Sequence, residues 1–117
     1  MVQEVLIVIN DAPYGTEKAY NALRLSIALQ SRENKVDVFL MADAVYCGLP
    51  GQETPQGYYN ISEMLGRVLA KGGRVAACGS CMKARGLRID GMIKGVEQGS
   101  MALLSEWTEK CEKIHSF

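Results

Sequence analysis

The residues VLIVI at positions 5–9 decide the fold class of this chain. A strand with one buried face alternates apolar and polar residues, whereas a strand in the middle of a parallel sheet is apolar throughout. Apolar residues recur at helical spacing between Thr16 and Ser31, and KVDVFLM at 35–41 is typical of a second strand. This order of strand, helix and strand predicts a parallel α/β sheet.

The rest of the chain continues this alternation. Asn60 is a suitable N-cap for a second helix, whose apolar positions are Ile61, Met64, Leu65, Val68 and Leu69. Ser100 is a suitable N-cap for a last helix, with an apolar stripe of Leu104, Trp107, Cys111 and Ile114. Further strands are expected at 74–78, 96–99 and 113–117, with an irregular or briefly helical segment at 87–95. No repeat or linker interrupts these elements, so we expect a single domain over residues 1–117.

A long connection, ADAVYCGLPGQETPQGYY at 42–59, shows no sustained period. It holds two of the three prolines and three of the five tyrosines, and it includes Tyr46 and Cys47. A connection of this length inside a compact domain is more often functional than filler. We therefore expect a functional loop here.

The charge and the length of the apolar segments exclude several classes of partner. Thirteen basic residues balance thirteen acidic ones, so no overall field attracts nucleic acid or an anionic membrane. No apolar stretch approaches the ~18 residues of a membrane span, and the first residues lack a signal-peptide cleavage pattern. We expect a cytoplasmic protein, in which a close cysteine pair reacts or binds metal rather than forming a structural disulfide.

The motif CGSCMKARG at 78–86 carries the candidate chemistry. Cys78 ends the predicted third strand, at the edge of an open α/β sheet where ligands usually bind. A short helix or a group of backbone N–H donors over residues 79–83 would stabilise a thiolate at Cys78. Positive charge nearby would come from Lys83, Arg85 and Arg88.

The small residues Gly79 and Ser80 leave room for a second sulfur atom to approach Cys78. A nucleophilic cysteine in this position could carry a persulfide, exchange disulfides, or form a disulfide with Cys81. These three reactions are the functional hypotheses for the motif.

Each of the four cysteines also has a structural interpretation. Cys78 is alternatively a small core hydrophobe behind a buried strand, and Cys81 is either a resolving thiol or a packing residue. Cys111 shares the apolar stripe of the last helix, which favours core packing. Cys47 is either a second redox thiol or a buried anchor of its loop.

Metal binding is a further alternative. Cys78 and Cys81 with Cys111 and His115 would supply four zinc ligands, although a predicted α/β segment follows the first pair instead of a zinc knuckle. Met82 beside Cys81 suggests Cu(I) ligation, but methionine commonly only fills gaps in the core. We expect His115 at the surface or at a sheet edge.

Several segments resemble the DsrE/DsrF-like family of small sulfur-relay proteins. They are VLIVIND, DAVYC, GQETPQGYYN, ISEMLGRVLAKGG, CGSCMKARG and GVEQGSMALLSEWTEKCEKIHSF, which together cover nearly the whole chain. The most specific mark is a cysteine followed seven residues later by arginine and glycine, here Cys78 with Arg85 and Gly86. The resemblance implies a three-layer α/β/α sandwich around a five-stranded, mainly parallel sheet, assembled into homotrimers or hexamers.

In the relay members of this family, the cysteine that matches Cys78 accepts sulfane sulfur as a persulfide and passes it to a partner's cysteine. This chemistry needs no cofactor. Cys81 is an additional cysteine shared with some small members, so a persulfide on Cys78 could be discharged internally as a disulfide. The loop at 42–59 would shelter the sulfur or form the contact between subunits, through Tyr46, Cys47, Tyr58 and Tyr59.

The expected function is therefore that of a sulfur carrier, sulfurtransferase-like at most, that acts between a donor protein and an acceptor protein. The alternative function is a non-enzymatic oligomeric binding module in which the cysteines are structural.

Overall fold

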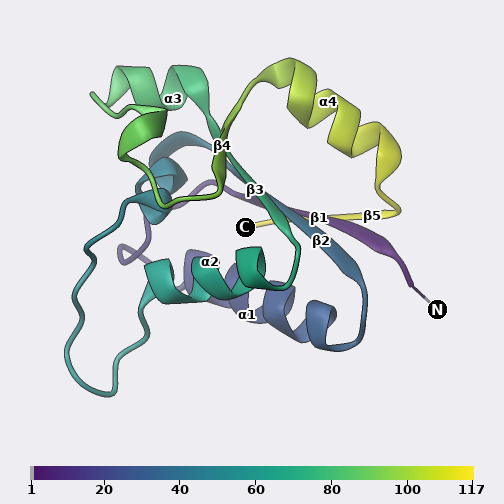
Figure 1. Cartoon of the computed structure of the whole chain (residues 1–117), viewed down its shortest axis with the longest axis horizontal. Coiled ribbons are helices and arrows are strands. Elements are labelled where there is room, and N and C mark those ends of the chain that lie inside the picture. The colour runs from purple at the N-terminus through teal and green to yellow at the C-terminus, as the bar shows by residue number, and fades with distance from the viewer. Residues whose placement is uncertain (1) are drawn as a thin grey trace.

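The computed structural model describes residues 2–117 and contains a five-stranded sheet in the order β4-β3-β2-β1-β5 (Figure 1). The strands are β1 Glu4–Ile9, β2 Lys35–Leu40, β3 Arg74–Cys78, β4 Val96–Gly99 and β5 Lys113–Ser116. All neighbouring strands are parallel, so their carboxyl ends lie along one edge of the sheet. The predicted strands are confirmed, and the sheet is parallel throughout rather than mainly parallel.

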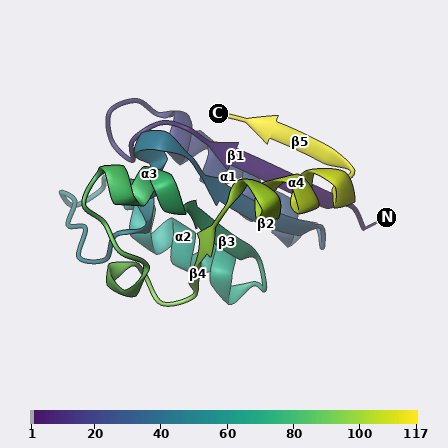
Figure 2. The same cartoon turned by 90° about the horizontal axis from the view of Figure 1, so that it is seen from above.

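Helices cover both faces of the sheet, which confirms the three-layer α/β/α sandwich (Figures 1 and 2). The α-helices are α1 Lys18–Ser31, α2 Ile61–Ala70, α3 Gly79–Ala84 and α4 Met101–Lys110. Helices α1 and α2 pack side by side on one face, and α4 lies on the other. Helix α3 projects from the carboxyl edge of the sheet, next to the end of β3.

The core lies between these layers and is built on the inner strands. Val5, Leu6, Ile7 and Ile9 of β1 are at most 3% exposed, as expected for a strand with two buried faces. On the α4 side, the ring of Phe39 meets Trp107 edge-on, with the ring centroids 5.9 Å apart. Trp107 is the buried residue of α4, and Leu103 and Leu104 of the same helix also pack against the core.

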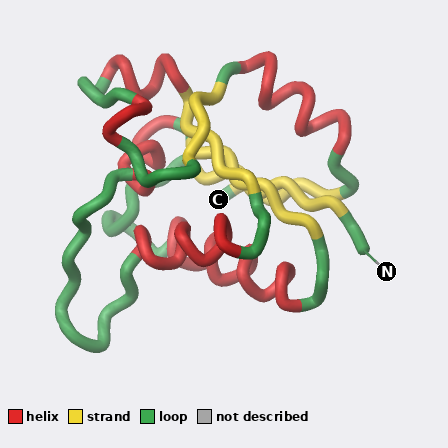
Figure 3. Tube along the Cα trace, in the orientation of Figure 1, coloured by secondary structure: helices red, strands yellow, loops and turns green. Residues whose placement is uncertain are grey.

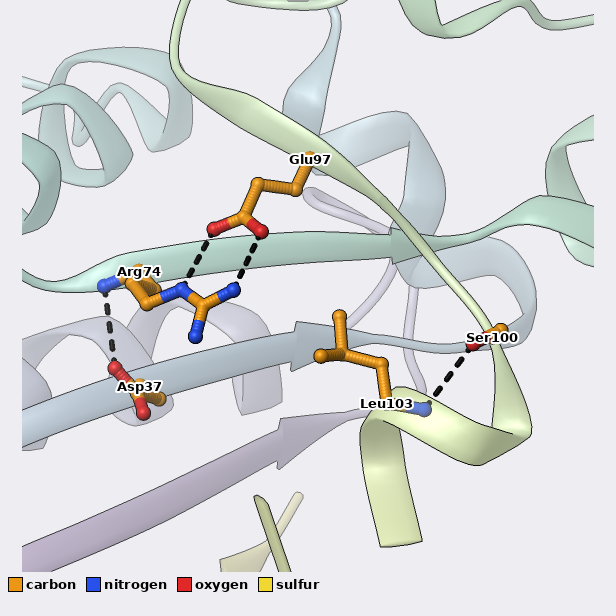
Figure 4. A network of polar contacts seen from close by, with 5 residues as sticks. All are labelled: Asp37, Arg74, Glu97, Ser100 and Leu103. Atoms are coloured by element: carbon orange, nitrogen blue, oxygen red, sulfur yellow. Dashed lines mark hydrogen bonds and ion pairs between the residues drawn. The ribbon is translucent and has the colours of Figure 1, made fainter. Parts of the chain in front are cut away.

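Polar contacts fix β4 beside β3 and start the last helix (Figure 4). The guanidinium of Arg74 pairs with the carboxylate of Glu97 through two hydrogen bonds of 2.8 and 2.7 Å. The backbone N–H of Arg74 donates to Oδ1 of Asp37 on β2 at 3.3 Å. Ser100 Oγ accepts from the N–H of Leu103 at 3.1 Å, which confirms Ser100 as the N-cap of α4.

The structure corrects the expected loop at 42–59. Its first residues form a 3-10 helix, η1 Ala42–Gly48, and only the segment after it is irregular (Figure 3). A 3-10 helix this short presents too few turns for a helical period to be visible in the sequence. A second 3-10 helix, η2 Ile89–Gly91, agrees with the briefly helical segment expected at 87–95.

The structure also corrects the apolar stripe of the last helix. Helix α4 ends at Lys110, with Cys111 as its C-cap, and Ile114 lies in β5 with 47% of its surface exposed. The backbone becomes extended at Cys111 because β5 must pair with β1. Cys111 and Ile114 therefore do not continue the helical face that buries Trp107.

No helix within residues 2–117 combines the length and the apolarity that crossing a bilayer requires.

Candidate functional site

Cys78 stands at the carboxyl edge of the sheet, where β3 passes directly into α3. It is the last residue of β3 and also the N-cap of α3. Its neighbour Gly79 fits tightly against β4, because a Cβ there would lie 3.2 Å from both Gln98 Nε2 and the carbonyl oxygen of Gly99. The glycine lets the chain turn into α3 without displacing β4.

The Cys78 sulfur accepts hydrogen bonds from the turn that follows it. The N–H of Cys81 donates to Cys78 Sγ at 3.3 Å, and the hydroxyl of Ser80 lies 3.4 Å from the same sulfur. Burial alone would raise the pKa of Cys78, but hydrogen bonds from Cys81 and Ser80 outweigh it, and the net pKa is lowered. The pKa values of Cys47, Cys81 and Cys111 are all raised.

A cavity of about 460 Å³ opens beside Cys78. Its walls combine apolar and polar side chains, which include Phe39, Met41, Ser80, Lys83, Gln98 and Met101. Cys78 is 8% exposed and is one of the residues that line this cavity. A thiol that is mostly buried yet borders a cavity of this size can meet a small reactant or a partner's side chain.

Two other cavities are larger but lack such a thiol. One of about 770 Å³ lies between α1 and α2, and one of about 470 Å³ lies where the strands begin. The second includes Cys111, whose pKa is raised by burial. We place the candidate site at the cavity of about 460 Å³ because it is lined by Cys78, a thiol with a lowered pKa.

Cys81 sits on the first turn of α3 and contacts η1. Its sulfur accepts a hydrogen bond of 3.3 Å from the backbone N–H of Ala42. Burial and the hydrogen bond to Cys78 raise the pKa of Cys81, while the Ala42 N–H and the charge of Arg85 act in the opposite direction. Because α3 follows β3 directly, Cys81 is a second thiol at the same edge of the sheet, and it is partly exposed.

The basic residues of the motif take different places. Arg85 donates to Asp43 Oδ1 at 2.9 Å and to the carbonyl oxygen of Cys81 at 3.0 Å, so its charge acts on Cys81. Lys83 is exposed and lines the cavity at Cys78. Arg88 pairs with Asp90 at 3.4 Å on the surface.

The aromatic and sulfur residues of the 42–59 segment are divided between two places. Cys47 is fully buried, and burial raises its pKa to about 12, as suits an anchor of η1. Tyr46 is partly exposed and lies in η1 beside Cys47. Tyr58 and Tyr59 stack on each other, with ring centroids 4.3 Å apart, and line the cavity between α1 and α2. They lie away from the cavity at Cys78, so they do not shelter its sulfur.

The four proposed zinc ligands are not brought together. Cys78 and Cys81 lie at the carboxyl edge of the sheet, whereas Cys111 lies at the edge where the strands begin. His115 is exposed on the edge strand β5, as expected. Over residues 2–117, no group of three or more His, Cys, Asp or Glu side chains is arranged to hold a metal ion. Met82 is 2% exposed and packs in the core.

The sequence analysis expected the 42–59 segment to contribute to the site through Tyr46 and Cys47, but it missed Ala42 and Asp43 of that segment and Gln98 of β4. Ala42 and Asp43 follow β2, and Gln98 belongs to β4, yet all three reach the surroundings of the two cysteines. Residues at the ends of neighbouring parallel strands share one edge of the sheet, so the position of these residues at strand ends was a signal in the sequence. Using it required the order of the strands, which the sequence pattern does not give.

Comparison with known proteins identifies relatives along the whole chain. The model of the DsrE/DsrF-like family matches residues 3–117. Protein YchN of Escherichia coli is 42% identical over 118 residues, which cover 99% of this chain and 100% of that protein. An uncharacterized protein of Methanopyrus kandleri is 37% identical over 116 residues, which cover 99% of this chain and 95% of the relative.

Solved structures agree with these relatives. The crystal structure of YchN from Escherichia coli matches with a TM-score of 0.93 at 42% identity, covering 98% of this chain and 99% of that chain. A protein of unknown function from Methanobacterium thermoautotrophicum shares the fold, with a TM-score of 0.76 at 16% identity over 98% of this chain and 99% of its own. The resemblance noted in the sequence is thus confirmed, and the chain belongs to the DsrE/DsrF-like family.

Proposed function

We propose that this protein is an intracellular sulfur carrier that holds sulfane sulfur as a persulfide on Cys78 and gives it to a partner's thiol. The observation that carries the proposal is the position of Cys78. Its thiol has a lowered pKa and borders a cavity of about 460 Å³ at the carboxyl edge of the sheet. Family membership supports the same type of chemistry.

Loading is a thiol exchange reaction. The Cys78 thiolate attacks the outer sulfur of a donor persulfide, the S–S bond of the donor breaks, and the donor leaves as a thiolate. Cys78 then carries the outer sulfur, which extends into the cavity that Lys83 lines. The ammonium group of Lys83 is the nearby charge that would pair with a terminal sulfur anion.

Unloading reverses the roles. The acceptor thiolate attacks the outer sulfur, the Cys78 Sγ–S bond breaks, and Cys78 leaves as a thiolate that the N–H of Cys81 and the Ser80 hydroxyl stabilise. The same hydrogen bonds thus favour the nucleophile in loading and the leaving group in unloading. Neither step requires a cofactor.

The acceptor must bring a cysteine to the mouth of the cavity. Met101 lines that cavity and has 64% of its surface exposed, so an acceptor that reaches the cavity would contact this side chain. We also propose a homo-oligomer, a trimer or a hexamer. Tyr58 and Ile114, which are 50% and 47% exposed, are candidates for its contacts.

The test is to treat the native protein with inorganic polysulfide and to locate the added sulfur by mass spectrometry of peptides. In samples quenched with acid immediately after loading, we expect one added sulfur at Cys78 in wild type, loss of the adduct in Cys78→Ser, and the same adduct as in wild type in the matched control Cys111→Ser. Cys111 suits the control because it is partly buried at the opposite edge of the sheet. Equal labelling of all four cysteines would contradict the proposal.

A further inference from the structure

We infer that Cys81 is a resolving thiol that attacks a persulfide on Cys78, releases hydrosulfide and leaves a Cys78–Cys81 disulfide. This inference rests on the proposed loading of Cys78 and adds a second activity, the reduction of sulfane sulfur to sulfide. A carrier with one thiol can only pass its sulfur on. A carrier with two thiols can also discharge it without an acceptor protein.

The Cys78 sulfur is held against the backbone of Cys81. The N–H of Cys81 donates to Cys78 Sγ at 3.3 Å, and the interaction with Cys81 is one of the causes that lower the pKa of Cys78. Both residues belong to the single turn that joins β3 to α3. Because Cys78 Sγ already contacts the residue that carries the second thiol, side-chain rotation can bring the two sulfur atoms to the disulfide bond length of about 2.05 Å.

The backbone at Ala42 is arranged around the Cys81 sulfur. Ala42 has a φ of 52°, in the left-handed region that alanine rarely occupies. The neighbouring Met41 N–H still bonds to the sheet, at Ile9, whereas the N–H of Ala42 donates to Cys81 Sγ at 3.3 Å. A strained residue that directs a donor at a sulfur atom suggests a role for that sulfur beyond packing.

Arg85 holds this arrangement in place. Its guanidinium bridges Asp43 Oδ1, at 2.9 Å, and the carbonyl oxygen of Cys81, at 3.0 Å. Asp43 follows Ala42 directly, so the bridge keeps the Ala42 N–H against the Cys81 sulfur. Arg85 also brings a positive charge that favours the Cys81 thiolate.

Loading of Cys78 should activate Cys81. In the free protein, burial and the hydrogen bond and charge of Cys78 raise the pKa of Cys81. When Cys78 carries an outer sulfur, the negative charge moves to that sulfur and away from Cys78 Sγ. The Ala42 N–H and Arg85 remain, so the balance shifts toward the Cys81 thiolate. Cys81 would then attack only after loading.

The reaction balances with the groups at hand. The Cys81 thiol gives its proton to the anionic outer sulfur, the Cys81 thiolate attacks Cys78 Sγ, the bond between Sγ and the outer sulfur breaks, and that sulfur leaves as hydrosulfide into the cavity. Cys78 and Cys81 supply the two electrons that reduce the sulfane sulfur. A cellular thiol reductant, oxidised to its own disulfide, returns the pair to its reduced form.

The test compares wild type, Cys81→Ser and the control Cys111→Ser after loading with inorganic polysulfide and rapid desalting. Released sulfide and intact mass are followed over time. We expect wild type and Cys111→Ser to release sulfide as they become two hydrogens lighter, while Cys81→Ser keeps the added sulfur on Cys78. If wild type retains its sulfur as long as Cys81→Ser and forms no disulfide, the inference is wrong. If Cys81→Ser never gains sulfur at Cys78, the carrier proposal itself fails, so the two failures are distinguishable.

A second variant tests the role of Asp43 as a positioning residue. Asp43→Asn removes the charged partner of Arg85 and should loosen Ala42 from Cys81. Each unit by which the Cys81 pKa then rises should slow sulfide release per loaded protein about threefold, since a smaller thiolate fraction is only partly offset by greater nucleophilicity. The pH profile of release should move to higher pH, and Asp43→Glu should partly restore it. A profile identical to that of wild type would show that the bridge has no part in the reaction.

Discussion

Cys78 and Gly99 are paired across β3 and β4 at the carboxyl edge of the sheet. A Cβ at position 99 would lie 2.7 Å from Phe39 Cζ and 3.1 Å from the carbonyl oxygen of Ala77. The glycine therefore allows the Phe39 ring to fill the space beside Cys78. Since Phe39, Cys78 and Gly99 line the same cavity, the packing of the core and the shape of the candidate site are coupled at this pair.

Gly99→Ala tests this coupling. The added methyl group must displace a ring that is 1% exposed, so we expect the free energy of unfolding in urea to fall by about 1–3 kcal/mol. The matched control is Gly66→Ala in the interior of α2, where a Cβ meets nothing within 4 Å. That control should raise the free energy of unfolding by roughly 0.5–1 kcal/mol. Equal effects in the two variants would contradict the steric explanation.

The pH dependence of Cys78 alkylation tests its thiolate. Because hydrogen bonds outweigh burial and lower the pKa, its alkylation should rise at a lower pH than that of an ordinary thiol, about 8.5. Ser80→Ala removes one of those donors and should move the midpoint to higher pH. The rate is read from labelled peptides, with Cys111 in the same sample as the internal reference. A Cys78 midpoint at or above that of Cys111 would contradict the lowered pKa.

Stability at alkaline pH tests the burial of Cys47. Burial raises its pKa in the folded protein to about 12, whereas an unfolded thiol has a pKa of about 8.5. The resulting stabilisation is complete below about pH 8.5 and is lost as pH rises toward 12, because the unfolded chain releases its proton first. In this window the free energy of unfolding of wild type should therefore fall by up to about 1.4 kcal/mol per pH unit relative to that of Cys47→Ala. The free energy of unfolding is measured at each pH by chemical denaturation. If it changed with pH in the same way in the two proteins, Cys47 would ionise as readily in the folded protein as in the unfolded chain.

Lys83→Gln tests the charge at the mouth of the cavity. Lys83 is exposed, so its attraction for an anionic persulfide is that of a surface ion pair. The loading rate of Cys78 in Lys83→Gln should therefore be only about two- to fivefold lower than in wild type. The difference from wild type should disappear at high salt. Lys113→Gln on the exposed edge strand β5 is the matched control and should load at the wild-type rate. If loading slowed equally in Lys83→Gln and Lys113→Gln, the cause would be the net charge of the protein and not the position of Lys83.

Much of the site follows from the sequence once the fold is known. Cys78 was placed at the end of a strand, and the turn from β3 into α3 was predicted from residues within that segment. The roles of the basic residues were not: Arg85 was expected to act on Cys78, but it bridges Asp43 and Cys81. Its partner is 42 residues away in the chain, and no local pattern connects them.

The sequence by itself determined the alternation of strands and helices, because burial on one or two faces leaves a period that neighbouring residues encode. It also determined that a thiol pair follows a buried strand. The tertiary structure alone decided the strand order, the enclosure of Cys47 and the contact of Ala42 with Cys81, whose positions are 39 residues apart. Those features depend on which strands lie side by side, and that choice is made by packing across the whole core, not by any short segment.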